Sequence, residues 1–198
     1  IYMTWITAGT KKKPENKKDD SNNLESEGST IYFYSGVTDD SVFSLNKELS
    51  KKDHQLQVLG LEHHIDPPPI RLKIHSYGGS VFSAFAAINY IIGSKCPVHT
   101  YVDGAAASAG TLMSVVGDKR YINENAYMLI HQLSGGHWGN YEQLKDDMEN
   151  SKALMKRIRD IYERHTRIPK SKLKELLKRD LWWDAETCLE YGLVDDII

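Results

Sequence analysis

The sequence predicts an α/β protein with a largely parallel sheet, because segments with strand character alternate with segments with helix character. The clearest strand covers residues 70–75, where apolar and polar side chains alternate. An apolar helix over residues 80–92 follows it, and residues 97–102 form the next strand. The chain shows no internal repeat, and its 198 residues suit one domain with a real hydrophobic core.

The first thirty residues, 1–30, are expected to form a flexible polar arm in front of a folded domain over residues 31–198. Residues 11–29 are nearly all Lys, Asp, Glu, Asn, Ser and Pro. Such a segment buries too little apolar surface to offset the entropy that it loses on ordering.

The other elements follow from hydrophobic periodicity and from capping and breaking residues. Early in the domain we expect a strand over residues 31–34, a helix capped by Asp40 or Ser41 that runs to about Ser50, and a proline-rich loop over residues 62–69. Later elements are a helix ending at Val116, strands over residues 119–122 and 126–130, an amphipathic helix over residues 141–165, and short helices over residues 171–177 and 185–191.

The composition is that of an ordinary protein and does not identify a function. An apolar fraction of 40% and a charged fraction of 26% are typical of a globular protein. The net charge of −2 gives no support for binding to nucleic acid or to an anionic membrane surface. No apolar run approaches the ~20 residues that span a bilayer, and no charged segment precedes the mildly apolar residues 1–9. We therefore expect a cytoplasmic protein.

Neither the cysteines nor the paired histidines predict a metal or redox site. Cys96 and Cys188 lie far apart, so we expect buried thiols in a reducing compartment. His63 and His64 are adjacent and point in different directions, and no third ligand follows at a useful spacing. We expect no metal ion and no cofactor.

Ser108 is the first candidate for chemistry, because it lies in a run of small residues at an expected strand-to-helix junction. A serine at such a junction commonly caps the helix. Its neighbours Ala107, Ala109 and Gly110 nevertheless leave its hydroxyl accessible and let a substrate carbonyl approach the backbone. The first N–H groups of the helix would stabilise developing negative charge.

A glycine pair, Gly78-Gly79, stands between another strand and helix. Glycines there allow positive φ and close approach of the backbone to a ligand. A plain turn or a phosphate cradle would use the same residues, but neither a dinucleotide fingerprint nor a Gly-x-x-x-x-Gly-Lys-Ser/Thr sequence occurs. The pair suits an oxyanion donor better.

His131 ends an apolar strand, and a histidine in such a place usually has a structural role. A serine nucleophile, however, needs a base within hydrogen-bond reach and an acid that orients the base. Composition does not choose that acid, and the candidates are Asp146, Asp147, Asp160, Asp180, Asp184, Asp195 and Asp196.

From Ile31 to Ile198 the chain resembles the ClpP family, the proteolytic subunits of ATP-dependent Clp proteases. The resemblance rests on five segments whose order and spacing match: Ser76-x-Gly-Gly-Ser-Val81, Gly104-x-Ala-Ala-Ser108-x-Gly110, Met128-x-Ile-His131-Gln132, Arg179-Asp180 and Glu190-Tyr-Gly-Leu-Val-Asp195. It implies the spiral of β-β-α units shared with crotonases, with a protruding handle helix at about residues 134–166.

The resemblance also implies the site. Ser108, His131 and Asp180 would form a catalytic triad, with the backbone N–H groups of Gly79 and Ala109 as the oxyanion hole. Substrate would be bound by Gly78, Ser80, Val81, Leu133, Ser134 and Gly135. The implied activity is that of a serine endopeptidase that cleaves unfolded polypeptides and short peptides through an acyl-enzyme.

The resemblance further implies partners. Members form two stacked rings of seven subunits, which a separate AAA+ unfoldase feeds with polypeptide, so that ATP is used by that partner and not by this chain. Neither nucleic acid nor a membrane is implied as a partner.

Tyr77 and Leu133 stand where the family usually has proline, and the polar arm replaces the segment that forms the axial gate. These departures indicate a divergent member, such as a phage-borne or organellar one.

Three alternatives remain open to test. A catalytically silent ring subunit would share the fold but not the activity. A crotonase-like acyl-CoA enzyme would need no serine nucleophile. An enzyme similar to signal-peptide peptidases would use a lysine base and usually a membrane anchor, which His131 and the absence of a long apolar run disfavour.

Overall fold

The computed structural model describes residues 24–198 and has the α/β architecture that the sequence predicts. Eight strands form one sheet: β1 (Leu24–Glu27), β2 (Thr30–Phe33), β3 (Ile70–Ser76), β4 (Val98–Ala107), β5 (Lys119–Ile122), β6 (Tyr127–Leu129), β7 (Trp182–Trp183) and β8 (Asp196–Ile197). The helices are α1 (Asp39–His63), α2 (Val81–Gly93), α3 (Ala109–Ser114), α4 (Tyr141–His165), α5 (Lys170–Leu176) and α6 (Ala185–Glu190).

The sheet divides at β4, and this division shapes the site. The main path runs β1-β2-β3-β4-β5-β8, while the far end of β4 pairs instead with β6, which in turn pairs with β7. His99–Val102 of β4 pair with β5, and Ala105–Ala107 pair with β6. All pairings are parallel except β1 with β2 and β6 with β7.

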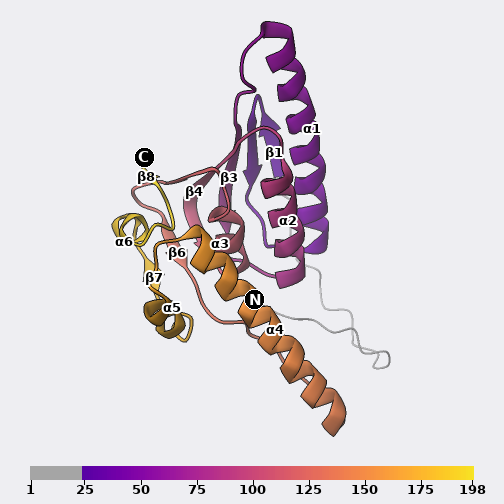
Figure 1. Ribbon diagram of the computed structural model, residues 1–198, viewed down its shortest axis with the longest axis vertical. Helices are drawn as coiled ribbons and strands as arrows, with labels where there is room; N and C mark the ends of the chain where they lie inside the picture. The colour runs from indigo at the N-terminus through magenta and orange to yellow at the C-terminus, as the bar shows by residue number, and fades with distance from the viewer. Residues whose placement is uncertain (1–23) are drawn as a thin grey trace, which may run out of the picture.

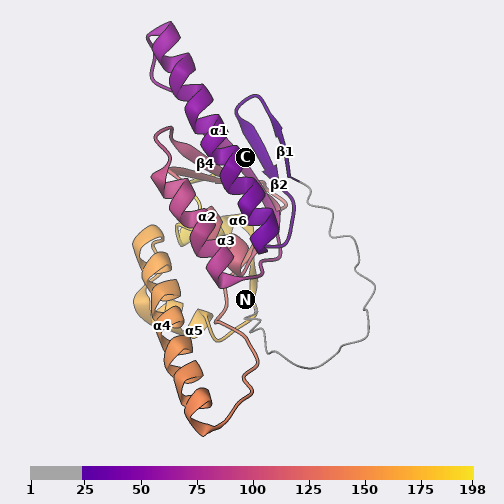
Figure 2. The same ribbon diagram turned by 90° about the vertical axis from the view of Figure 1, so that its right-hand side faces the viewer.

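The core lies between the sheet and the helices α1, α2 and α3, which cover one of its faces (Figures 1 and 2). Ile70, Leu72 and Ile74 point into this core and are fully buried. Their neighbours Arg71 and Lys73 face the other side, as the alternation in the sequence predicts.

Helix α4 projects away from this body in both views (Figures 1 and 2). Only Ile158, Ile161 and Tyr162, all in its C-terminal half, are buried. Asn140 and Gln143 close a reciprocal capping box at its N-terminus, so the exposed end has its first N–H groups satisfied. The helix has the bounds expected from the sequence.

The N-terminal expectation was wrong for residues 24–30, whereas residues 1–23 lie outside the described part. Residues 24–27 form the edge strand β1, with Leu24 opposite Phe33. The segment is polar because β1 exposes most of its side chains, and a positive φ of 55° at Gly28 makes the tight turn to β2. Backbone pairing with β2 therefore orders a segment that has little apolar surface.

The first helix also differs from expectation. Its cap is Thr38, whose hydroxyl accepts a hydrogen bond from the Ser41 N–H, while the Thr38 N–H donates to the Ser41 hydroxyl. The helix continues beyond Ser50 to His63, where His64 adopts a left-handed conformation and ends it. Leu56 and Gly60 stay buried along this extension, which gives it one packed face.

Both cysteines are buried and unpaired, which confirms the expectation of buried thiols. Burial raises the pKa of Cys96 to about 11 and that of Cys188 to about 12. Among residues 24–198, no three His, Cys, Asp or Glu side chains gather as a metal ion would need, and no helix there is long and apolar enough to cross a membrane.

Candidate active site

Ser108 stands at the turn between β4 and α3 in a conformation unusual for a residue with a side chain. Its φ is 57° and its ψ is −121°, and its hydroxyl makes no capping hydrogen bond to α3. The helix-cap interpretation of this serine is therefore wrong. Such a conformation costs about 1–3 kcal/mol and persists only where surrounding structure imposes it, as at the strained turns that present nucleophilic serines.

His131 lies within hydrogen-bond reach of this hydroxyl. Its Nε2 is 2.8 Å from Ser108 Oγ. The Ser108 N–H also donates to the Leu129 carbonyl at 2.8 Å, so the strand that leads to the histidine is bonded directly to the serine's backbone. The pairing of β4 with β6 thus sets the distance between the two side chains.

Asp180 is the acid that lies against this histidine. His131 Nδ1 is 3.4 Å from Asp180 Oδ1, and the Asp180 side chain is 81% exposed. Four of the six other candidates have different partners: Asp147 meets His137, Asp160 meets Lys156, Asp184 caps α6 and Asp195 pairs with Arg120. The choice that composition left open is made by this geometry.

The electrostatics of His131 suit a proton acceptor. Burial lowers the pKa of His131 below its ordinary value, and the Asp180 carboxylate partly opposes that shift. The imidazole is therefore neutral at pH 7. A neutral imidazole is the form that accepts a proton from a hydroxyl.

Gly78 packs directly against the serine turn, and Gly79 packs against Val37. A Cβ on Gly78, whose φ is 93°, would stand 2.6 Å from Ser108 Cβ and 2.7 Å from the Ala107 carbonyl oxygen. A Cβ on Gly79, whose φ is 151°, would stand 2.3 Å from the Val37 carbonyl oxygen. A side chain at Gly78 would therefore displace the serine turn, and one at Gly79 would displace Val37.

The resemblance assigns the oxyanion hole to the backbone N–H groups of Gly79 and Ala109. The Val37 N–H donates to the Gly78 carbonyl, and the Val37 carbonyl accepts from the Ser80 N–H, so the Gly79 N–H points away from Val37. Ala109 is the first residue of α3, and its N–H has no acceptor within the helix.

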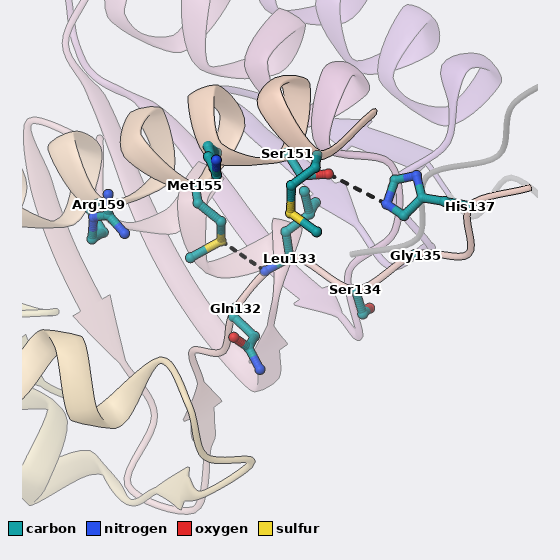
Figure 3. Close-up of a pocket in the computed structure, with 10 residues that line it drawn as sticks. Gln132, Leu133, Ser134, Gly135, His137, Ser151, Met155 and Arg159 are labelled. Carbon is teal, nitrogen blue, oxygen red and sulfur yellow. Dashed lines mark hydrogen bonds between the residues drawn. The ribbon is translucent and has the colours of Figure 1, made fainter. Parts of the chain in front are cut away.

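A cavity of about 410 Å³ lies beyond His131, between the segment after it and α4 (Figure 3). The segment contributes Gln132, Leu133, Ser134, Gly135 and His137, and α4 contributes Met148, Ser151, Lys152, Met155 and Arg159. Leu133, Ser134 and Gly135 were expected to bind substrate. The helix residues were missed, although their spacing of three to four marks one helix face.

His137 attaches this segment to α4. Its Nδ1 lies 3.3 Å from Asp147 Oδ2 and its Nε2 3.5 Å from Ser151 Oγ, while the Leu133 N–H lies 3.1 Å from Met155 Sδ (Figure 3). These contacts fix the wall of the cavity.

The remaining residues expected to bind substrate lie elsewhere. Val81 is buried in the core, and the Ser80 hydroxyl accepts from the Ser83 N–H at the start of α2. Gly78 abuts Ser108 itself and does not line the cavity.

A strained serine, a neutral histidine and a carboxylate in line, at the end of a strand in an α/β sheet, define the class of serine hydrolases. The Clp protease family model matches residues 25–198. The chain belongs to the Clp protease family, which confirms the family and fold that the resemblance implied.

The chain is also 33% identical over 144 residues to the ATP-dependent Clp protease proteolytic subunit of Deinococcus radiodurans. That match covers 72% of this chain and 71% of the relative. The family places the chain among the serine peptidases.

Proposed function

We propose that this chain is a serine endopeptidase that cleaves unfolded polypeptides and short peptides through an acyl-enzyme. The observation that carries the proposal is the line from Ser108 Oγ through His131 to Asp180, with distances of 2.8 Å and 3.4 Å. A capping or merely structural serine would not need this arrangement. A crotonase-like acyl-CoA enzyme would not need the serine at all.

The first step forms the acyl-enzyme. His131 Nε2 takes the proton of Ser108 Oγ as that oxygen attacks the carbonyl carbon of the scissile peptide. The N–H groups of Gly79 and Ala109 hold the oxyanion that develops. Losing one such donor typically lowers kcat by ~10²- to 10³-fold.

The second half of the cycle releases both products. The imidazolium of His131 donates its proton to the leaving amine, which departs with the C-terminal fragment. Water, deprotonated by His131, then attacks the ester and frees the N-terminal fragment and Ser108. Asp180 orients the ring and stabilises its charged form during both transfers.

The substrate is proposed to lie between two backbone segments. Gly78 abuts Ser108, and Leu133, Ser134 and Gly135 follow His131 and line the cavity. The cavity beside His131 would take a side chain of the substrate. Its walls, Met148 and Met155 with Leu133, favour an apolar side chain.

The assembly is proposed from the relative's name and from exposed apolar surface. The Deinococcus relative is named as a subunit of an ATP-dependent protease. Trp138 and Tyr141, at the exposed end of α4, are 93% and 73% exposed in the single chain. We infer a homo-oligomer, of two stacked seven-membered rings, in which these side chains are covered.

An AAA+ unfoldase is the proposed ATP-using partner, because the sequence carries no phosphate-binding loop. No cofactor and no metal ion are proposed, and the cytoplasm is the proposed location.

The decisive experiment is covalent labelling of the assembled protein with a fluorophosphonate, together with hydrolysis of short fluorogenic peptides. Wild type should be labelled at Ser108 and should hydrolyse the peptides. Ser108→Ala should lose labelling and lose about 10⁶-fold in kcat, as removal of a triad nucleophile does elsewhere. Ser114→Ala, a buried serine of α3 away from His131, is the matched control and should keep both signals.

An assembled wild type that is neither labelled nor active would instead support the silent ring subunit. Binding of a fatty-acyl-CoA without labelling would support the crotonase-like alternative.

A further inference from the structure

Two exposed aromatic side chains, Tyr77 and Trp182, contact each other near the proposed catalytic residues. The rings of Tyr77 and Trp182 lie 6.3 Å apart, centroid to centroid, with their planes at 81°. Tyr77 is 69% exposed and Trp182 is 44% exposed. Tyr77 directly precedes the Gly78-Gly79 pair, and Trp182 follows Asp180 by two residues. The contact therefore joins the two segments that flank the catalytic serine and histidine.

The two rings reach each other across two strands. The strands lie in the order β3, β4, β6, β7 here, so β4 and β6 separate the segment of Tyr77 from that of Trp182. Neighbouring strands are ~4.8 Å apart, so only long side chains that lean toward each other make contact over two intervening strands. In the register of the sheet, Ala107 is opposite Leu129, which is opposite Trp182.

Tyr77 is supported from the sheet side. Its ring packs edge-on against His75 at 5.6 Å, and His75 packs against Tyr34 at 5.4 Å. Tyr34 donates in turn to the Asp103 carboxylate, which also meets Lys73. The Tyr77 ring therefore stands on a row of side chains that is fixed to the sheet.

The position of Asp180 depends on contacts that neighbouring residues make. Its carboxylate is 81% exposed, and within residues 24–198 its polar contact is the one with His131. The strand that follows it, β7, has only two residues. Trp183 secures β7 on one side, with its ring 4.9 Å from that of Tyr191 and under the Lys172 ammonium. On the other side of β7, the ring of Trp182 contacts the ring of Tyr77.

We propose that Tyr77 and Trp182 are positioning residues that hold β7, and with it the preceding Asp180, at a fixed distance from the Gly78-Gly79 segment. This inference rests on the triad proposed above. The edge-to-face contact links the side of the site that supplies the acid to the side that supplies an oxyanion donor. A contact of this kind is worth more than its buried area alone, because the ring edge meets the negative face of its partner.

The test compares Tyr77→Ala and Trp182→Ala with Tyr77→Phe and Trp182→Phe in the assembled protein. Peptide hydrolysis gives kcat and KM, and the rate of fluorophosphonate labelling is followed against pH. Each alanine variant should lower kcat by about 10-fold with KM within about twofold, since small misplacements of catalytic groups are costly. Each phenylalanine variant keeps a ring and should retain most of the activity. The double alanine variant should lose little more than either single one.

The pH profile separates positioning from general loss of structure. The charged or titratable groups around the pair are Asp180 beside His131, His75 beside Tyr77, and Lys172 beside Trp183. When Asp180 moves away, its support for the charged imidazole weakens, so the acidic limb of labelling should shift to lower pH in both alanine variants. A merely destabilised protein would lose active fraction without moving that limb.

Tyr90→Ala removes an aromatic ring of similar exposure on α2 and is the matched control, with no change expected. Should an alanine variant fail to assemble, the same measurements on Tyr77→Leu and Trp182→Leu decide. The proposal is overturned if kcat and the pH limb match wild type, or if only KM rises, which would assign the pair to substrate contact. Absence of labelling in wild type would instead overturn the proposed function.

Discussion

At the scale of single residues, the site depends on three positions whose backbone conformation is unfavourable for most residues with a side chain. Ser108 keeps a positive φ, and Gly78 and Gly79 keep theirs beside it at 93° and 151°. A Cβ on Gly78 would collide with the nucleophile's own Cβ, and a Cβ on Gly79 would collide with the Val37 carbonyl oxygen. Strain and close approach are therefore concentrated where the proposed chemistry takes place.

Gly78→Ala should damage both stability and activity. The new methyl group must displace the Ser108 turn, and the positive φ disfavours alanine, so we expect a loss of about 1–3 kcal/mol in the free energy of unfolding. A displaced hydroxyl should slow labelling by about 100-fold. Denaturant unfolding and labelling rates measure the two effects. Gly93→Ala, where a Cβ meets nothing within 4 Å, should be neutral or stabilising.

Asp180→Asn should lower activity and move the pH profile. Asp180 raises the pKa of His131 against the effect of burial, so its removal lowers that pKa further. Because His131 acts as a base only in its neutral form, the acidic limb of kcat/KM should move to lower pH. We expect kcat to fall by about 10³-fold, less than the ~10⁴-fold seen when a buried triad acid is replaced, because this carboxylate is largely exposed. An unmoved limb would contradict the contact.

At the scale of elements, the site is held by the docking of α4 on α3. The Tyr162 side chain of α4 is fully buried, and its hydroxyl bonds to Thr111 Oγ1. Thr111 Oγ1 also donates to the Ser108 carbonyl at 2.6 Å. The helix that forms one wall of the cavity is thus connected to the backbone of the nucleophile.

Tyr162→Phe should therefore cost about 1 kcal/mol in the free energy of unfolding, the typical net value of one neutral hydrogen bond. The ring keeps its place, and Thr111 keeps its bond to Ser108, so labelling of Ser108 should change by less than about threefold. Tyr141→Phe, at an exposed position on the same helix, should leave stability unchanged. Equal stability of wild type and Tyr162→Phe would contradict the role of this bond.

At the scale of the whole molecule, the free end of α4 and the loop before it leave several large apolar side chains uncovered in the single chain. Tyr141, Leu144 and Met148 of α4 are exposed, as is Trp138 in the loop before the helix. Other exposed apolar side chains, such as Phe43 and Leu61 of α1, lie on the body of the domain. The group at the end of α4 stands on a projecting helix, and it supports the proposed interface between subunits.

Light scattering should give a native mass that is a multiple of 22.5 kDa, and Leu144→Asp should lower it. A charge buried at the covered end of α4 has no partner there, so association should weaken. Glu142→Ala, on the same turn but charged already, is the control and should keep the mass. A wild-type monomer that nevertheless hydrolyses peptides would contradict the proposed assembly while leaving the proposed chemistry intact.

The sequence by itself determined the class and much of the element order. The alternation at residues 70–75, the amphipathic pattern at residues 141–165 and the small-residue run before Ser108 depend on local chemistry, which acts between residues close in the chain. Where local chemistry was weak, as in the polar edge strand at residues 24–27 or the long solvated extension of α1, the prediction was wrong.

Only the tertiary structure decided which acid meets His131, because seven aspartates competed and local patterns do not reveal distances across a sheet. The same holds for the conformation of Ser108, for the α4 wall of the cavity, and for the contact of Tyr77 with Trp182. Each of these depends on contacts between segments far apart in the chain, such as the pairing of β4 with β6. Local sequence patterns predict which residues are suited to the chemistry, and long-range pairing decides which of them come together.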